Sequence, residues 1–135
     1  MSAIVFDSSV LIAILRQEPG SEVGEQALND ALISTVYLAE VATYLARNSV
    51  PPETINQALA AFPIEVVPFD REQGIIAGCL YPACKSLGLS LGDKPTAWLP
   101  LRACLALAKS KNLPVLTADK AWLELEIDVT VNSIR

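Results

Sequence analysis

The sequence contains no histidine among its 135 residues. This absence excludes acid–base catalysis by histidine, nucleophiles that a histidine activates, and ordinary zinc sites. Hydrolytic chemistry in this chain would therefore depend on carboxylates and on hard metal ions.

Cysteine is scarce as well, and Cys79, Cys84 and Cys104 form no C-x-x-C pair. An odd number of cysteines without such a pair favours buried, reduced thiols over a disulfide or a metal site.

Basic residues are in the minority, because 10 Lys and Arg stand against 15 Asp and Glu, which gives a net charge of -5. This balance argues against a strongly basic surface for nucleic acid. It does not exclude a nuclease, because bound metal ions reverse the charge of an acidic cluster locally.

Long hydrophobic runs are also missing, since none approaches the roughly 18 to 20 residues that cross a bilayer. The N-terminus has no basic region or cleavage site of a signal peptide, so we expect a cytoplasmic protein without membrane contact. The chain is long enough for a single domain, residues 1–135, with a core that needs no disulfide or metal. Its hydrophobic fraction of 52% suits a sheet covered by helices on both faces.

Short β-type runs alternate with longer segments of helical period. Strands are expected at 3–6, 64–69, 115–117 and 127–131, with a strand or turn at 31–34. Helices are expected at 8–16, from 21, at 35–46, from 52, at 70–87, at 102–111 and at 120–125. This alternation predicts an α/β fold, a three-layer α/β/α domain with a central, mainly parallel sheet.

Asp7 lies between the apolar run 3–6 and the helical segment 8–16. It would therefore stand at the carboxyl end of a buried strand, where open α/β sheets bind their ligands. The alternative is that Asp7 or Ser8 only caps the following helix. Asp119 follows the strand at 115–117 in the same way, so both acids would face one edge of a parallel sheet.

Glu40 is the one charged residue in segment 35–46, which is apolar almost all the way round. Such a helix is expected to be buried, and an unpaired carboxylate inside it would be costly. Glu40 would then need a metal ion, a raised pKa or a buried salt bridge. Asp93 follows Gly92 and is a further candidate ligand, although a helix cap explains it equally well.

Carboxylates that converge on one cleft repel one another unless a cation lies between them. An all-oxygen ligand set suits Mg²⁺ or Mn²⁺ better than zinc or copper. Such ions polarise a phosphodiester and lower the pKa of a bound water. The acids therefore predict metal-dependent hydrolysis of phosphodiester bonds.

Four segments, each with one of the candidate acids, follow one another along the chain: Val5-Phe-Asp-Ser-Ser-Val-Leu-Ile-Ala13, Leu38-Ala-Glu-Val-Ala42, Leu89-Ser-Leu-Gly-Asp93 and Leu116-Thr-Ala-Asp119. Together they resemble the motifs of PIN-domain ribonucleases, and most closely those of VapC-type toxins from toxin–antitoxin pairs. The resemblance covers nearly the full length of the chain.

The resemblance implies a set of catalytic, metal-binding carboxylates, namely Asp7, Glu40, Asp93 and Asp119. It implies that Ser8 and Thr117 are hydroxyls that orient ligands or water. It further implies Mg²⁺ or Mn²⁺ as cofactor, endonucleolytic cleavage of RNA, a homodimer, and a cognate antitoxin protein that blocks the site.

Residues 94–101 depart from the family pattern, in which the third acid runs directly into a helix. Two prolines in this segment resist a simple extension of the helix, which puts the place of Asp93 in question. Trp98 would stack on an unpaired base, or else pack into the core or a dimer contact. The acids are flanked by basic residues, namely Lys94, Arg102 and Lys120. Their side chains would contact phosphates or would be solvated surface charges.

The leading hypothesis is a metal-dependent endoribonuclease that acts as a toxin. An alternative of a different class is a catalytically weak PIN-fold protein for dimerisation and partner binding, which the insertion after Asp93 suggests. A receiver or phosphatase that forms an aspartyl phosphate on Asp7 is less favoured. Such phosphatases commonly carry a second Asp two residues on, where this chain has Ser9.

Overall fold

The computed structural model describes residues 2–87 and 98–135, which form one five-stranded sheet in the order β3-β2-β1-β4-β5. All neighbouring strands are parallel. The strands are β1 (Ile4–Phe6), β2 (Ala31–Ser34), β3 (Glu65–Val67), β4 (Val115–Thr117) and β5 (Val131–Ser133). The segment that the sequence left open between strand and turn is thus β2, and the last strand lies later than expected.

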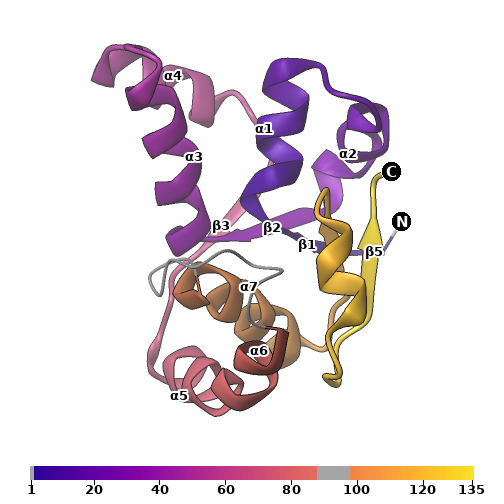
Figure 1. Cartoon of the computed structure of the whole chain (residues 1–135). Helices are drawn as coiled ribbons and strands as arrows, with labels where there is room; N and C mark the ends of the chain where they lie inside the picture. Colours follow the sequence, from indigo (N-terminus) through magenta and orange to yellow (C-terminus); the bar gives the residue numbers. More distant parts are fainter. Residues whose placement is uncertain (1, 88–97) are drawn as a thin grey trace.

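Helices cover both faces of the sheet, as Figure 1 shows. One face carries α1 (Ser8–Arg16), α2 (Ser21–Ala27), α3 (Thr35–Arg47) and α4 (Pro52–Ala60). The other carries α5 (Arg71–Cys79), α6 (Tyr81–Leu87) and α7 (Trp98–Lys111). Short 3₁₀ turns are η1 (Leu28–Asp30) and η4 (Lys120–Glu124). The predicted three-layer α/β/α architecture is confirmed.

The strand order reverses between β1 and β4. The chain runs from β1 through β2 to β3 at one edge, and then returns to the other side of β1 to form β4 and β5. Right-handed crossovers place the helices of the two halves on opposite faces of the sheet. The carboxyl ends of β1 and β4 therefore flank the position at which open α/β sheets bind their ligands.

Helix α7 is the most deeply buried helix among the described residues. Its residues 103–108 are all fully buried, because α7 packs on β1 and is also contacted by α3, α5 and α6. An apolar run without a polar face is the pattern that such a position requires.

Helix α3 is not buried all round, so that expectation is wrong. Only Tyr37 and Val41 are buried, while Ala39, Glu40 and Thr43 are exposed. The exposed face carries small side chains, and small apolar residues are common at a protein surface. Glu40 therefore bears no burial cost, and the argument that it needs a cation for that reason fails.

Two helix boundaries also differ from the expectation. The helix predicted at 70–87 is divided into α5 and α6, with Pro82 in the first turn of α6. The last long helix begins at Trp98, inside the inserted segment, and holds Pro100 in its first turn. Proline is tolerated there because the first amides of a helix have no intrahelical partner.

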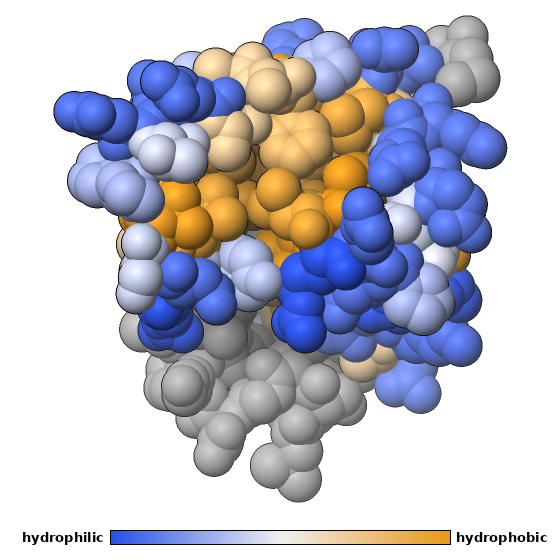
Figure 2. Space-filling view, turned by 90° about the horizontal axis from the view of Figure 1, so that it is seen from above, coloured by the Kyte–Doolittle hydropathy of each residue, from blue (hydrophilic) through white to orange (hydrophobic). Residues whose placement is uncertain are grey.

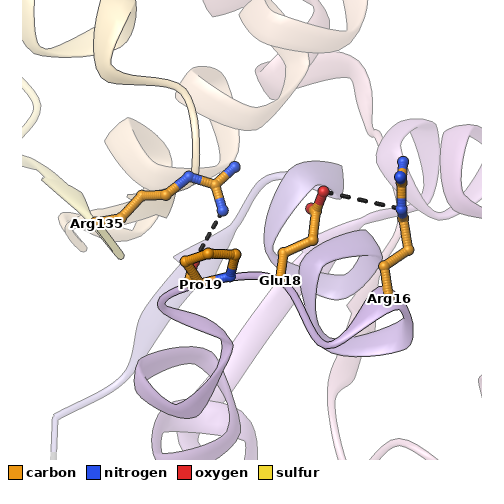
Figure 3. Close-up of polar contacts among 4 residues, drawn as sticks. All are labelled: Arg16, Glu18, Pro19 and Arg135. Carbon is orange, nitrogen blue, oxygen red and sulfur yellow. Dashed lines mark hydrogen bonds and ion pairs between the residues drawn. The ribbon is translucent and has the colours of Figure 1, made fainter.

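The C-terminus packs against the turn between α1 and α2. Arg135 Nη1 donates a hydrogen bond to the Pro19 carbonyl at 2.9 Å (Figure 3). Beside it, Arg16 and Glu18 form a largely exposed ion pair of 3.8 Å. Gly20 in this turn has φ +89°, and a Cβ there would lie 2.4 Å from the Ile134 carbonyl oxygen. Both the conformation and the space therefore require glycine.

The three cysteines are free. Cys84 and Cys104 are buried as expected, whereas Cys79 is exposed. Within residues 2–87 and 98–135, no helix combines the length and apolar character needed to cross a membrane.

Candidate active site

Asp7 follows β1 directly and is almost wholly buried, with 3% of its surface exposed. It is the N-cap of α1, because its Oδ1 accepts a hydrogen bond from the Val10 amide at 3.3 Å. The helix cap that the sequence assigned to either Asp7 or Ser8 therefore belongs to Asp7. Exposed caps are common, so the burial of this carboxylate needs a further explanation.

Two hydroxyl groups hold the Asp7 carboxylate, one on each oxygen. Ser9 Oγ donates to Oδ1 at 2.5 Å, and Thr117 Oγ1 donates to Oδ2 at 2.5 Å. Each hydroxyl also accepts a backbone amide, from Ala118 to Ser9 at 2.9 Å and from Asp119 to Thr117 at 3.0 Å. The carboxylate after β1 is thus tied to the segment after β4.

Burial raises the pKa of Asp7 from 3.8 to about 6, although hydrogen bonds from Ser9, Thr117 and Val10 lower it. One pKa unit corresponds to about 1.4 kcal/mol, so the ionised carboxylate bears a net cost of about 3 kcal/mol in this place. A cation beside Asp7 would relieve that cost.

Asp119 follows β4 and lies on the surface, where its Oδ1 caps η4 by accepting the Ala121 amide at 3.0 Å. Strands β1 and β4 are parallel neighbours, with Phe6 paired to Leu116. Asp7 and Asp119 therefore leave adjacent strands at the same edge of the sheet.

Tyr37 connects these acids to Glu40, which lies one helical turn further along α3. The pKa of Tyr37 is raised well above its ordinary value, first by burial, next by the charge of Asp7, and to a smaller extent by Glu40 and Asp119. Its ring stacks on Trp122 with centroids 6.2 Å apart. The charges of all three carboxylates therefore act on the Tyr37 hydroxyl.

The family follows from a direct comparison of the sequence. Residues 4–127 match the family model described as PIN domain. The chain belongs to the PIN domain family. No match to a curated protein sequence reached significance.

Several solved structures are similar in fold to this PIN domain. A DNA-bound VapBC from Salmonella typhimurium is 18% identical, with 100% of both chains covered and a TM-score of 0.73. A toxin–antitoxin complex from Klebsiella pneumoniae is 17% identical, with 98% of each chain covered and a TM-score of 0.70. The VapBC-5 structure from Mycobacterium tuberculosis is 25% identical, covers 100% of this chain and 99% of its own, and has a TM-score of 0.59.

The remaining residues predicted for the PIN-domain site are placed differently. Ser8 opens α1 beside Asp7, and its hydroxyl makes no hydrogen bond to an acid of the site within the described part of the chain. Asp93 lies outside the described residues. Ser9 contacts Asp7 and was missed by the sequence reasoning. Its position in the first helical turn was the available signal, since a hydroxyl there can reach back to the capping side chain.

The basic residues beside the acids serve different purposes. Arg102 Nη1 donates to the Ala77 carbonyl at 3.0 Å, and its guanidinium lies 5.4 Å from the centre of the Tyr81 ring. Arg102 therefore joins α7 to α5 and α6. Lys120 is exposed at the start of η4, next to Asp119, and Lys94 lies outside the described residues.

A divalent cation needs several oxygen ligands in one place. Among residues 2–87 and 98–135, no group of three or more Asp, Glu or Cys side chains lies close enough together to hold a metal ion. Mg²⁺, however, is commonly held by one or two carboxylates together with water and substrate phosphates. Asp7 and Asp119 supply such an oxygen pair at one edge, and the buried charge of Asp7 gains from a cation. The residues present therefore fit a hard divalent ion.

A surface hollow of about 480 Å³ lies elsewhere on the PIN domain. It is lined by the end of α7 and the amino ends of β4 and β5, including Lys109, Pro114 and Thr130. Parallel strands place their amino ends opposite their carboxyl ends, so this hollow lies away from Asp7. Its lining contains a single acid, Asp128, and we therefore assign the candidate active site to the carboxyl edge.

Proposed function

We propose that this PIN domain is a metal-dependent endoribonuclease and the toxin of a toxin–antitoxin pair. The observation that carries the proposal is the placement of the buried Asp7 and of Asp119 after β1 and β4, the strands between which the strand order reverses. Membership of the PIN family implies a nuclease. The motif resemblance to VapC-type toxins supports RNA as the substrate.

In this proposal the metal-binding carboxylates are Asp7, Glu40, Asp93 and Asp119. A bound Mg²⁺ or Mn²⁺ supplies a Lewis acid that polarises the phosphodiester and lowers the pKa of the attacking water. Thr117 orients Asp7 through its bond to Oδ2, and Ser8 lies beside that carboxylate at the start of α1. Burial and the charge of Asp7 raise the pKa of Tyr37 further, so its hydroxyl carries no charge that would compete with the carboxylates.

We also propose that a cognate antitoxin covers a hydrophobic face of this toxin. Figure 2 shows hydrophobic side chains gathered on the side of the molecule where α1 and α4 lie. Partly buried apolar residues of these helices include Ile12, Leu15 and Leu59. Exposed hydrophobic areas of this kind mark interaction sites, and the similar solved structures include toxin–antitoxin complexes. The resemblance also implies a homodimer.

Co-purification tests the partner. A small protein encoded next to this gene should co-purify with the wild-type chain and be lost from Leu59→Asp, because a charge in an apolar interface is costly. Leu123→Asp, at an exposed position of η4, is the matched control and should retain the partner. Equal retention by both variants would contradict the proposed surface.

RNA cleavage tests the enzyme. The purified chain is incubated with structured and single-stranded RNA in Mg²⁺ or Mn²⁺, with EDTA as the control. We expect cleavage with the ions, none with EDTA, and a loss of about 100-fold or more in Asp7→Asn, because a ligand is removed. Asp128→Asn, an exposed acid at the opposite edge of the sheet, should cleave like the wild type.

Cleavage that survives EDTA or Asp7→Asn would contradict the mechanism. A chain that binds no Mn²⁺ at millimolar concentration and cleaves no RNA would favour the catalytically weak, partner-binding alternative. In the described part of the chain, no third acid lies close enough to complete a three-ligand metal site, and this observation speaks for that alternative.

A further inference from the structure

Ser9 makes two hydrogen bonds at the carboxyl edge of the sheet but has no role in the proposed function. Its hydroxyl donates to Asp7 Oδ1 at 2.5 Å and accepts the amide of Ala118 at 2.9 Å. Ser9 belongs to α1, whereas Ala118 follows β4. One hydroxyl therefore bridges the two halves of the sheet at its carboxyl edge.

This bridge is one of two parallel relays. The amide of Ala118 donates to Ser9, which donates to Oδ1, and the amide of Asp119 donates to Thr117, which donates to Oδ2. A hydroxyl can donate one hydrogen bond and accept others, so both relays are chemically complete. Consecutive amides thus reach the two oxygens of one carboxylate.

The two relays differ in what they fix. Thr117 is the last residue of β4 and is fully buried, so the strand already holds it. The Ser9 relay crosses from α1 to Ala118, the residue before Asp119. The Thr117 relay and the hydrogen bond from the Asp7 amide to the Leu116 carbonyl at 3.2 Å also join the two strands, but neither uses the Ala118 amide. Without the Ser9 hydroxyl, the Ala118 amide would lose this acceptor, and Asp7 Oδ1 would keep the longer bond from the Val10 amide at 3.3 Å.

We propose that Ser9 is a positioning residue that fixes Asp7 and Asp119 relative to each other. The inference rests on the proposed function, because only a shared metal site needs this spacing. Ligand side chains must be held within about 0.5 Å of their productive geometry. Residues that orient metal ligands typically change metal affinity or activity by about 10- to 100-fold when they are replaced.

The test compares Ser9→Ala with Ser9→Thr, which keeps the hydroxyl. Ser110→Ala is the matched control, because it removes a hydroxyl that donates to the Leu107 carbonyl at 2.9 Å in α7, away from the site. Three quantities are measured: the Mn²⁺ dissociation constant by calorimetry, kcat and KM for RNA, and the amide hydrogen exchange of Ala118.

Ser9→Ala should weaken Mn²⁺ binding about 10-fold or more and lower kcat with little change in KM. It should also speed the exchange of the Ala118 amide. Ser9→Thr should stay within about threefold of the wild type, and Ser110→Ala should match it. If Ser9→Ala does not fold, Ser9→Cys, which keeps a weak donor of similar size, should show the same losses to a smaller degree.

Wild-type Mn²⁺ affinity and kcat in Ser9→Ala would overturn the positioning role and leave the proposed nuclease intact. Unchanged exchange at Ala118 would overturn the relay itself. A wild-type chain that binds no Mn²⁺ would overturn the proposed function and this inference with it.

Discussion

Asp7 serves the local structure and the candidate chemistry at the same time. It caps α1 through the Val10 amide, yet it is buried where the ionised form is disfavoured. A structural cap would function equally well at the surface. The stability that this residue gives up is typical of a functional site, where local rules of stability are broken.

The stability of the metal-free protein should fall as the pH rises through the pKa of Asp7. The folded-state pKa of about 6 exceeds the ordinary 3.8, so between these values the folded chain holds a proton that the unfolded chain has released. Asp7 therefore costs nothing below about pH 4 and costs about 3 kcal/mol above about pH 7. Asp7→Asn should unfold at higher urea concentration than the wild type at pH 7.5 in EDTA, and should lose most of this advantage near pH 4.5.

The control for this measurement is Asp128→Asn, which replaces an exposed acid and should shift stability equally at both pH values. An Asp7→Asn effect that is the same at pH 4.5 and pH 7.5 would refute the burial of an ionised carboxylate.

The single residues of the site were predictable to different degrees. The place of Asp7 at the end of an apolar strand was predictable, because strand ends show in the hydrophobic pattern, whereas Thr117 was indicated only by the family resemblance. The reason given for Glu40 was wrong, since an apolar pattern made of alanine does not distinguish an exposed helix from a buried one. Ser9 was missed because its role depends on Ala118, which is distant in sequence.

At the scale of elements, α7 is the buried helix, whereas α3, which the sequence predicted to be buried, is not. Neither helix has a broad polar face. Helix α7 lies between the sheet and α5, whereas only one side of α3, with Tyr37 and Val41, is buried against its neighbours. Which helix occupies the inner position depends on the crossovers and not on local composition. The starts of α6 and α7 were mispredicted because proline is compatible with a first helical turn.

Leu105→Ala in α7 should lower the free energy of unfolding by about 2 to 5 kcal/mol, because it opens a cavity in the core. Leu105 is fully buried, whereas Leu123 is 51% exposed, so Leu123→Ala should change stability by no more than about 0.5 kcal/mol. Urea titration of both variants measures the difference. Equal losses would show that α7 is not the central helix.

Gly20→Ala should destabilise the protein by about 1 to 3 kcal/mol, since it forces alanine to a positive φ and against the Ile134 carbonyl. Gly74→Ala provides the opposite case, because a Cβ in this α5 position meets nothing within 4 Å. We expect it to stabilise the helix by about 0.5 to 1 kcal/mol. Thermal unfolding separates the two, and a harmless Gly20→Ala would contradict the close packing of the C-terminus.

At the scale of the whole molecule, the alternation of strands and helices was enough to predict an α/β domain with a parallel sheet. The strand order was not predictable, because five short apolar strands pair equally well in several orders. That order makes β4 the neighbour of β1, and it therefore places Asp7 and Asp119, which any parallel sheet would bring to the same edge, on adjacent strands. The role of Asp93 stays a prediction, because the residue lies outside the described ranges.

The most direct test of this shared edge is the Mn²⁺ affinity of wild type, Asp7→Asn, Asp119→Asn and the double variant, measured by calorimetry. If both acids bind one ion, each single variant should lose about 10-fold or more, and the double variant should lose clearly less than the product of the two losses. Wild-type affinity in Asp119→Asn, or losses that multiply independently, would contradict a common metal site.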